Sequence, residues 1–168
     1  MQPTGRNSAH RGFSLIEAAV ATAIVGIGIV ALVAAMEAGT RSNAGGRQLT
    51  QAIVLAQNIR EWTVRLPFCD PDGGTIIGPE QSSPQVFVDD LDDLMDVVFT
   101  PPRDGLGQPI VNMANWSQSI QMTWRDPNSL VTSVSPGTSN IIHVRVEVFC
   151  GAKNIYTTGW LVAKRSQS

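Results

Sequence analysis

A glutamate at the start of an apolar run near the N-terminus is the most informative ionisable residue of the chain. Nineteen consecutive residues without a charge extend from Ala18 to Met36, and Glu17 directly precedes them. Burying an ionised carboxylate in a bilayer costs about 3 kcal/mol unless the group lies near the interface or finds a cationic partner. Glu17 therefore either reaches the membrane edge or neutralises a positive charge close to it.

A cut between Gly12 and Phe13 would create such a positive charge. Phe13 would then begin a helix with a free α-amine, and Glu17 would lie one helical turn along from it. A carboxylate in this turn also suits the positive end of the helix dipole. The spacing thus indicates that Glu17 neutralises an amine, either its own or that of a neighbouring chain.

The apolar run predicts a membrane-spanning helix. Phe13 to Met36 would extend about 36 Å as a helix, which is enough to cross the hydrocarbon layer. Arg6 and Arg11 precede it without any acidic residue, which favours a cytoplasmic N-terminus and places the bulk of the chain on the other side. A secretory signal peptide cut after Ala38 is the alternative, but such peptides have shorter apolar regions and no internal carboxylate.

The segment around the expected cut resembles the processing site of type IV prepilins. The matching residues are Gly12, Phe13, Ser14, Leu15, Ile16 and Glu17. The resemblance implies that prepilin peptidase, a membrane aspartyl peptidase, cuts after Gly12 and methylates the new N-terminal Phe13. It also implies that Glu17 pairs with the N-terminal amine of an adjoining subunit during assembly. The implied partners are prepilin peptidase, other pilin or pseudopilin subunits that pack through the N-terminal helix, and the lipid of the bacterial inner membrane.

The apolar run carries a second, looser resemblance. Residues 23–32, AIVGIGIVAL, are similar to stretches in minor pilins of the pilus-modification class and in I-type minor pseudopilins. Many major pilins have proline at the twenty-second mature position, where this chain has Ala34. These features favour a minor subunit and leave open whether the filament is a pilus or a type II secretion pseudopilus.

Beyond the apolar run, the chain predicts an amphipathic continuation of the helix. Gly39, Gly45 and Gly46 are weak points for a helix, and Pro67 ends it. Between them, apolar residues recur at helical spacing: Leu49, Ala52, Ile53, Ala56, Ile59, Trp62 and Leu66. The expected organisation is a cleaved leader (1–12), a transmembrane or filament-core helix (13–36), its amphipathic continuation (37–66) and a periplasmic head (67–168).

The last third of the chain alternates apolar and polar residues with the period of a strand. Three such runs, 116–126, 141–149 and 155–163, are separated by turn-forming residues, and they predict an antiparallel meander. The expected fold is therefore α+β: a long N-terminal helix, membrane-spanning in its first half, packed on a small antiparallel sheet in the manner of a pilin.

Two segments between the helix and the sheet contain carboxylates of the kind that cation sites use. Residues 69–84 are rich in proline and glycine and predict a loop. An acidic stretch follows and favours a short helix, because its spacing lacks the regular ligands of a calcium loop. Its aspartates are Asp89, Asp90, Asp92, Asp93 and Asp96. No metal or cofactor is expected.

The only cysteines, Cys69 and Cys150, both follow the apolar run. In an oxidising envelope they would form a disulfide, with two free thiols as the alternative. A closed zinc site needs four donors, which this pair alone does not supply.

No catalytic motif is present, so an enzyme is not expected. His10 lies in the expected leader, and His143 lies on a predicted strand as an exposed residue. A formal net charge of −2 without a basic run gives no support to a nucleic-acid surface. The alternative to a filament subunit is a membrane-anchored periplasmic domain that binds a ligand or a protein and never polymerises.

Overall fold

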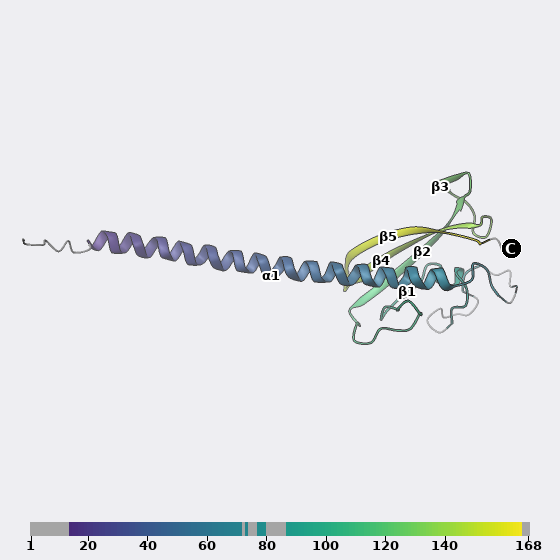
Figure 1. Cartoon of the computed structure of the whole chain (residues 1–168), viewed down its shortest axis with the longest axis horizontal. Helices are drawn as coiled ribbons and strands as arrows, with labels where there is room; N and C mark the ends of the chain where they lie inside the picture. The colour runs from purple at the N-terminus through teal and green to yellow at the C-terminus, as the bar shows by residue number, and fades with distance from the viewer. Residues whose placement is uncertain (1–13, 72, 74–76, 80–86, 166–168) are drawn as a thin grey trace, which may run out of the picture. The chain divides into compact units, whose positions relative to one another are not determined.

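The computed structural model describes residues 14–71, 73, 77–79 and 87–165. It contains one long helix and five strands, in the order α1 (Leu15–Arg65), η1 (Asp92–Leu94), β1 (Val98–Phe99), β2 (Trp116–Asp126), β3 (Ser129–Ser133), β4 (Ile141–Cys150) and β5 (Lys153–Ala163) (Figure 1). The predicted α+β class, with a long N-terminal helix on a small antiparallel sheet, is confirmed. The chain divides into two compact units, Met1–Gly45 and Gly46–Ser168.

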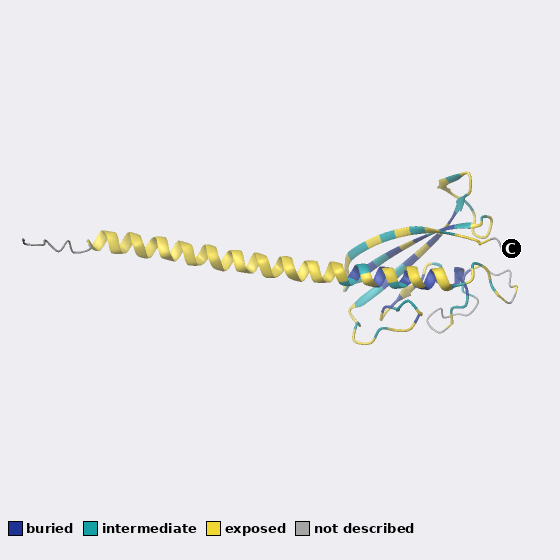
Figure 2. Cartoon of the chain, viewed as in Figure 1, coloured by how far each residue is buried: buried dark blue, intermediate teal, exposed yellow. Residues whose placement is uncertain are grey.

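In the first unit the described residues form the N-terminal part of α1. Every residue from Leu15 to Gly45 is exposed, as the uniform yellow of this part in Figure 2 shows. The helix runs without a break through Gly39 and Gly45, so the expected weak points do not interrupt it. By length and composition, α1 is long and apolar enough to cross a membrane.

In the second unit the C-terminal part of α1 packs on the sheet. The helix residues buried there are Ala52, Leu55, Ala56, Ile59, Trp62 and Thr63. The apolar helix face predicted from the sequence is confirmed for Ala52, Ala56, Ile59 and Trp62. At its start the buried face differs from the prediction, because Leu49 is 43% exposed whereas Leu55, which was not predicted, is fully buried. Helix α1 ends at Arg65, two residues before Pro67, as a proline stop requires.

The predicted meander is confirmed by the strand pairing. Strands β2, β4 and β5 pair antiparallel in that order, and β1 extends the sheet on the other side of β2. Met122 pairs with Val144, and both side chains are buried on the face that α1 covers. Strand β3, which pairs only with the end of β2, lies in a segment that the sequence indicated as a connection.

A fully buried glutamine links the helix to the sheet and to the loop after β1. The Nε2 group of Gln118 donates to the Leu55 carbonyl at 2.8 Å and to the Arg103 carbonyl at 3.1 Å. Its Oε1 accepts from the Arg103 backbone N–H at 2.6 Å. Because a buried amide must find such partners, Gln118 specifies how these three segments meet.

The loop after β1 also closes over the aromatic end of the core. The rings of Trp62 and Phe99 lie 5.6 Å apart, centroid to centroid. Gly107 has a φ of +77°, and a Cβ added there would lie 2.5 Å from Trp62 Cζ2. Glycine is therefore needed at position 107 for two reasons: the backbone is left-handed there, and a side chain would clash with the Trp62 indole.

Candidate functional site

The expected processing site lies at the start of the described chain. Gly12 and Phe13, the residues of the expected cut, lie outside the described residues, and so does His10. Ser14 begins the helix: its carbonyl accepts from the backbone N–H of Glu17 at 3.0 Å and of Ala18 at 3.1 Å, and its hydroxyl accepts from Glu17 N–H at 3.2 Å. The serine thus acts as the N-cap of α1.

Glu17 lies in the first turn of α1 with its side chain exposed. A carboxylate there is stabilised by the helix N-terminus, and it stays available to a cation outside the helix. The other carboxylate of the first unit differs in this respect, because Glu37 already pairs with Arg41 one turn along. Of these two acids, only Glu17 has no ion pair within the part of the chain that the structure describes.

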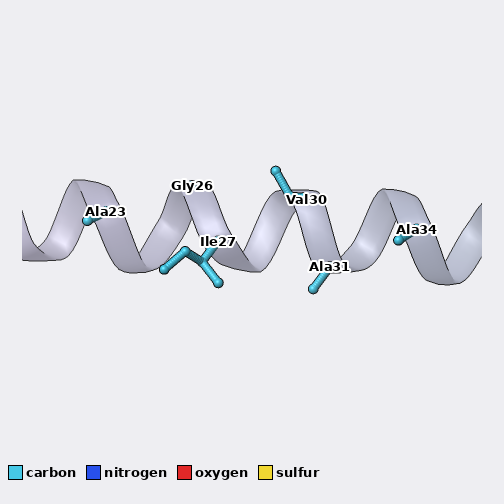
Figure 3. Close-up of a pocket in the computed structure, with 6 residues that line it drawn as sticks. All are labelled: Ala23, Gly26, Ile27, Val30, Ala31 and Ala34. Carbon is cyan, nitrogen blue, oxygen red and sulfur yellow. The ribbon is translucent and has the colours of Figure 1, made fainter.

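One face of α1 is hollowed by small side chains. A shallow groove of about 520 Å³ is lined by Ala23, Gly26, Ile27, Val30, Ala31 and Ala34. Figure 3 shows these residues on successive turns of the helix. A Cβ added at Gly26 would meet nothing within 4 Å, so no other part of the described chain fills this face. Small residues at this spacing let two apolar helices approach closely. This face was not predicted from the sequence, although its residues recur at the 3.6-residue period of a helix.

The expected short acidic helix is present as a single 3₁₀ turn inside a compact loop. Only Asp92–Leu94 is helical, as a 3₁₀ turn. Asp90 Oδ1 accepts the backbone N–H groups of Asp92 at 2.9 Å and Asp93 at 3.2 Å. Asp92 Oδ2 accepts the N–H of Gly78 at 2.7 Å. The aspartates compete with helix formation because their carboxylates bind the backbone locally.

The carboxylates of this segment serve as acceptors for backbone N–H groups. Among the described residues no group of three or more His, Cys, Asp or Glu side chains could hold a metal ion. Asp90, Asp92 and Asp93 are buried, and they are used as acceptors for backbone N–H groups. Their arrangement therefore supports a structural role in holding the loop before β1.

Asp90 should make the stability of the head depend on pH. Burial, followed by the charge of Asp92, raises the pKa of Asp90 from 3.8 to about 7. Between pH 4 and about 7, Asp90 is therefore protonated in the folded protein but ionised in the unfolded chain. The free energy of unfolding should fall as the pH rises through this range. Chemical denaturation across this range should show the decline. Asp90→Asn keeps an acceptor oxygen and removes the charge, so it should flatten the decline.

The exposed Asp96 of the same segment provides the control for this experiment. Asp96→Asn should retain the wild-type pH dependence. A decline of equal slope in Asp90→Asn and in the wild type would show that other groups cause it. The pKa of Asp89 is also raised, first by burial, and it contributes in the same direction.

The predicted disulfide does not form in this structure. Cys69 and Cys150 are both free. Lys164 Nζ donates to Cys69 Sγ at 3.2 Å, and the Lys164 N–H donates to the Asn140 carbonyl, just before β4 begins. Cys150 ends β4, which places it about 30 Å from Asn140 at the rise of a strand. A disulfide requires Cα atoms within about 7 Å, so the two thiols are too far apart.

His143 is half-buried on β4, not exposed as predicted. Its Nδ1 lies 3.4 Å from Arg125 Nη2. Burial, then the charges of Arg125 and Arg145, lowers the pKa of His143. A neutral imidazole beside two arginines fits a packing role on the face of the sheet opposite α1.

Comparison with known families bears on the N-terminal segment. The family described as the prokaryotic N-terminal methylation motif matches residues 7–33. Neither the curated proteins nor the solved structures contain a match to the chain. The matched range includes the expected cut, Glu17 and most of the small-residue groove. The chain therefore carries the class III signal of type IV pilin-like precursors, which is a prepilin peptidase processing site.

Proposed function

We propose that this protein is a structural subunit of a type IV pilin-like filament. Prepilin peptidase cuts between Gly12 and Phe13, and the new N-terminal amine of Phe13 is methylated. The observation that carries the proposal is the methylation motif at residues 7–33, which continues into a helix whose side chains are all exposed up to Gly45. An apolar helix without partners in its own chain needs lipid or other helices around it.

The subunit has two states in this proposal. Before assembly, the helix of residues 13–36 anchors it in the inner membrane, with the N-terminus in the cytoplasm and residues 67–168 in the periplasm. In the filament the same helix packs against those of other subunits, with residues 37–66 continuing it into the head. Glu17 neutralises the Phe13 amine of an adjoining subunit, and the small-residue groove admits a neighbouring helix.

A minor subunit is favoured over a major one, in either a pilus or a type II secretion pseudopilus. Ala34 stands where many major pilins carry a proline, and α1 is helical without interruption through this residue. Proline there would remove a helical hydrogen bond and bend the helix. A head that remains anchored and never polymerises is the second candidate.

Mass spectrometry of the mature N-terminus tests the proposal. The chain, expressed with a prepilin peptidase and purified from membranes, should begin at a methylated Phe13. A chain that still begins at Met1, or one cut after Ala38, would overturn the filament proposal. Recovery in the sheared filament fraction would then separate an assembled subunit from the anchored domain.

A further inference from the structure

A groove in the second unit lies between the last turns of α1 and β5. It has a volume of about 1350 Å³, and its lining includes Val64, Trp160 and Val162. Trp160 and Val162 pair with Val144 and Ile142 of β4, so they lie on the face of the sheet that α1 packs against. In contrast to their buried partners they are only half-buried, and Figure 2 shows the exposed and intermediate colours continuing along β5. The helix therefore covers β2 and β4 but leaves this side of β5 accessible.

Four cationic side chains line the same groove. They are Arg60, Arg65, Lys164 and Arg165, all exposed. Asp70 is the single acidic residue of the lining. This excess of positive charge occurs in a chain whose formal net charge is −2. An occupant with carboxylates is favoured, because arginine and carboxylate groups form short, charge-assisted hydrogen bonds.

The groove is bordered by an unpaired strand edge. Among the described strands β5 pairs only with β4. The Lys164 N–H donates to Asn140, and in an antiparallel ladder such pairs alternate, so Val162 and Trp160 bond to β4 while Leu161 and Ala163 direct their backbone groups outward. An unpaired edge of this kind can accept an added strand.

The Trp160 indole supplies a further donor. Its Nε1 is buried and has no hydrogen-bond partner in the described part of the chain. Buried donors are normally paired, so an acceptor from outside the described part of the chain is expected at this point. A carbonyl or carboxylate of a segment lying in the groove would meet this need.

We propose that this groove binds an acidic, extended segment of a partner protein, which adds a strand to β5 and places its carboxylates against the four cations. A second copy of this chain does not fit, because its acidic stretch holds Asp90, Asp92 and Asp93 buried. Nucleic acid fits less well, because a strand edge and the apolar lining of Val64 and Val162 offer nothing to a phosphate backbone. This inference does not depend on whether the protein polymerises.

Peptide binding to the full chain in detergent micelles tests the proposal. The probe is a fluorescein-labelled peptide of alternating glutamate and threonine, measured by fluorescence anisotropy at about 0.05 M salt, where screening is weak. The matched peptides carry glutamine for glutamate, or keep the glutamates and have alternate backbone nitrogens methylated. The glutamate peptide should bind at least about tenfold more tightly than either matched peptide, since each lacks one of the two interactions.

Two double variants locate the site. Arg60→Gln with Arg65→Gln, and separately Lys164→Gln with Arg165→Gln, should each weaken binding about tenfold. Arg47→Gln with Lys153→Gln removes two exposed cations that do not line the groove, and it should leave binding unchanged. Equal binding of the methylated peptide would exclude strand addition. Failure of the glutamate peptide to bind, or tighter binding of a single-stranded oligonucleotide that the groove variants abolish, would overturn the proposal.

Discussion

Replacing Gly12 with glutamate should leave the chain uncut, with Met1 still at its N-terminus. A peptidase must bring the bond between Gly12 and Phe13 against its catalytic groups, and a glycine without a Cβ permits the closest backbone approach. A misplacement of about 1 Å can lower a rate by about a hundredfold, so nearly all of the variant should remain as precursor. The measurement is the intact mass of the membrane-extracted protein after coexpression with prepilin peptidase.

The leader supplies a matched control for this variant. Gly5→Glu introduces the same side chain into the same segment, away from the expected cut. It should be processed like the wild type. Normal processing of Gly12→Glu would place the cut elsewhere, and poor processing of both variants would point to a general effect of negative charge in the leader.

Replacing Glu17 with glutamine should abolish incorporation into a filament while leaving processing intact. In the proposed assembly, the Glu17 carboxylate neutralises an α-amine of a neighbouring subunit inside an apolar bundle. Removing one partner of a buried ion pair costs about 3–5 kcal/mol, which corresponds to a loss of about a hundredfold or more in the assembly equilibrium. The measurement is the ratio of sheared filament to membrane pool, quantified by immunoblotting.

Glu37→Gln is the corresponding control on the same helix. Glu37 pairs with Arg41 within its own chain, and this exposed pair contributes little. Its loss should leave the filament fraction at the wild-type level. Equal incorporation of Glu17→Gln and Glu37→Gln would remove the support for the amine pairing, whereas equal loss in both would indicate a general need for negative charge on α1.

The sequence predicted the sheet well because its strands bury one face. Ile120 and Met122 of β2 and Val144 and Val146 of β4 alternate with polar residues, and all four are buried. When one face of a strand is buried, apolar and polar residues alternate along it, and this alternation can be seen in the sequence. The same physics explains why β3 was missed: Leu130 is 47% and Val131 is 87% exposed, so this strand has no buried face to reveal it.

The acidic turn and the cysteines were harder to predict, because both depend on contacts between distant segments. Asp92 binds the backbone of Gly78, and this contact becomes visible only once the loop is folded. Cys69 and Cys150 are compatible with a disulfide in composition and in their position after the apolar run. The length of β4 separates the two thiols. The sequence predicted this strand, but it did not indicate that the loop holding Cys69 lies near the start of β4 and not near its end.

The candidate site itself was predicted almost entirely from local sequence. Gly12, Phe13 and Glu17 lie in one linear segment, and the methylation motif that matches residues 7–33 includes all three. The basic groove beside β5 is the opposite case. Arg60 and Arg65 are far from Lys164 and Arg165 in the chain, and only the packing of α1 on the sheet brings these four cations to one groove.

The two free cysteines, Cys69 in the loop after α1 and Cys150 at the end of β4, have a practical consequence. In this structure neither thiol forms a covalent cross-link, so both remain available for labelling. Cys69 lies beside Lys164 near the start of β4, and Cys150 ends the strand about 30 Å from Asn140, so the two thiols provide well-separated attachment points for a pair of spectroscopic labels. The distance between the two labels would measure any stretching of the sheet, including stretching caused by a pulling force on the head.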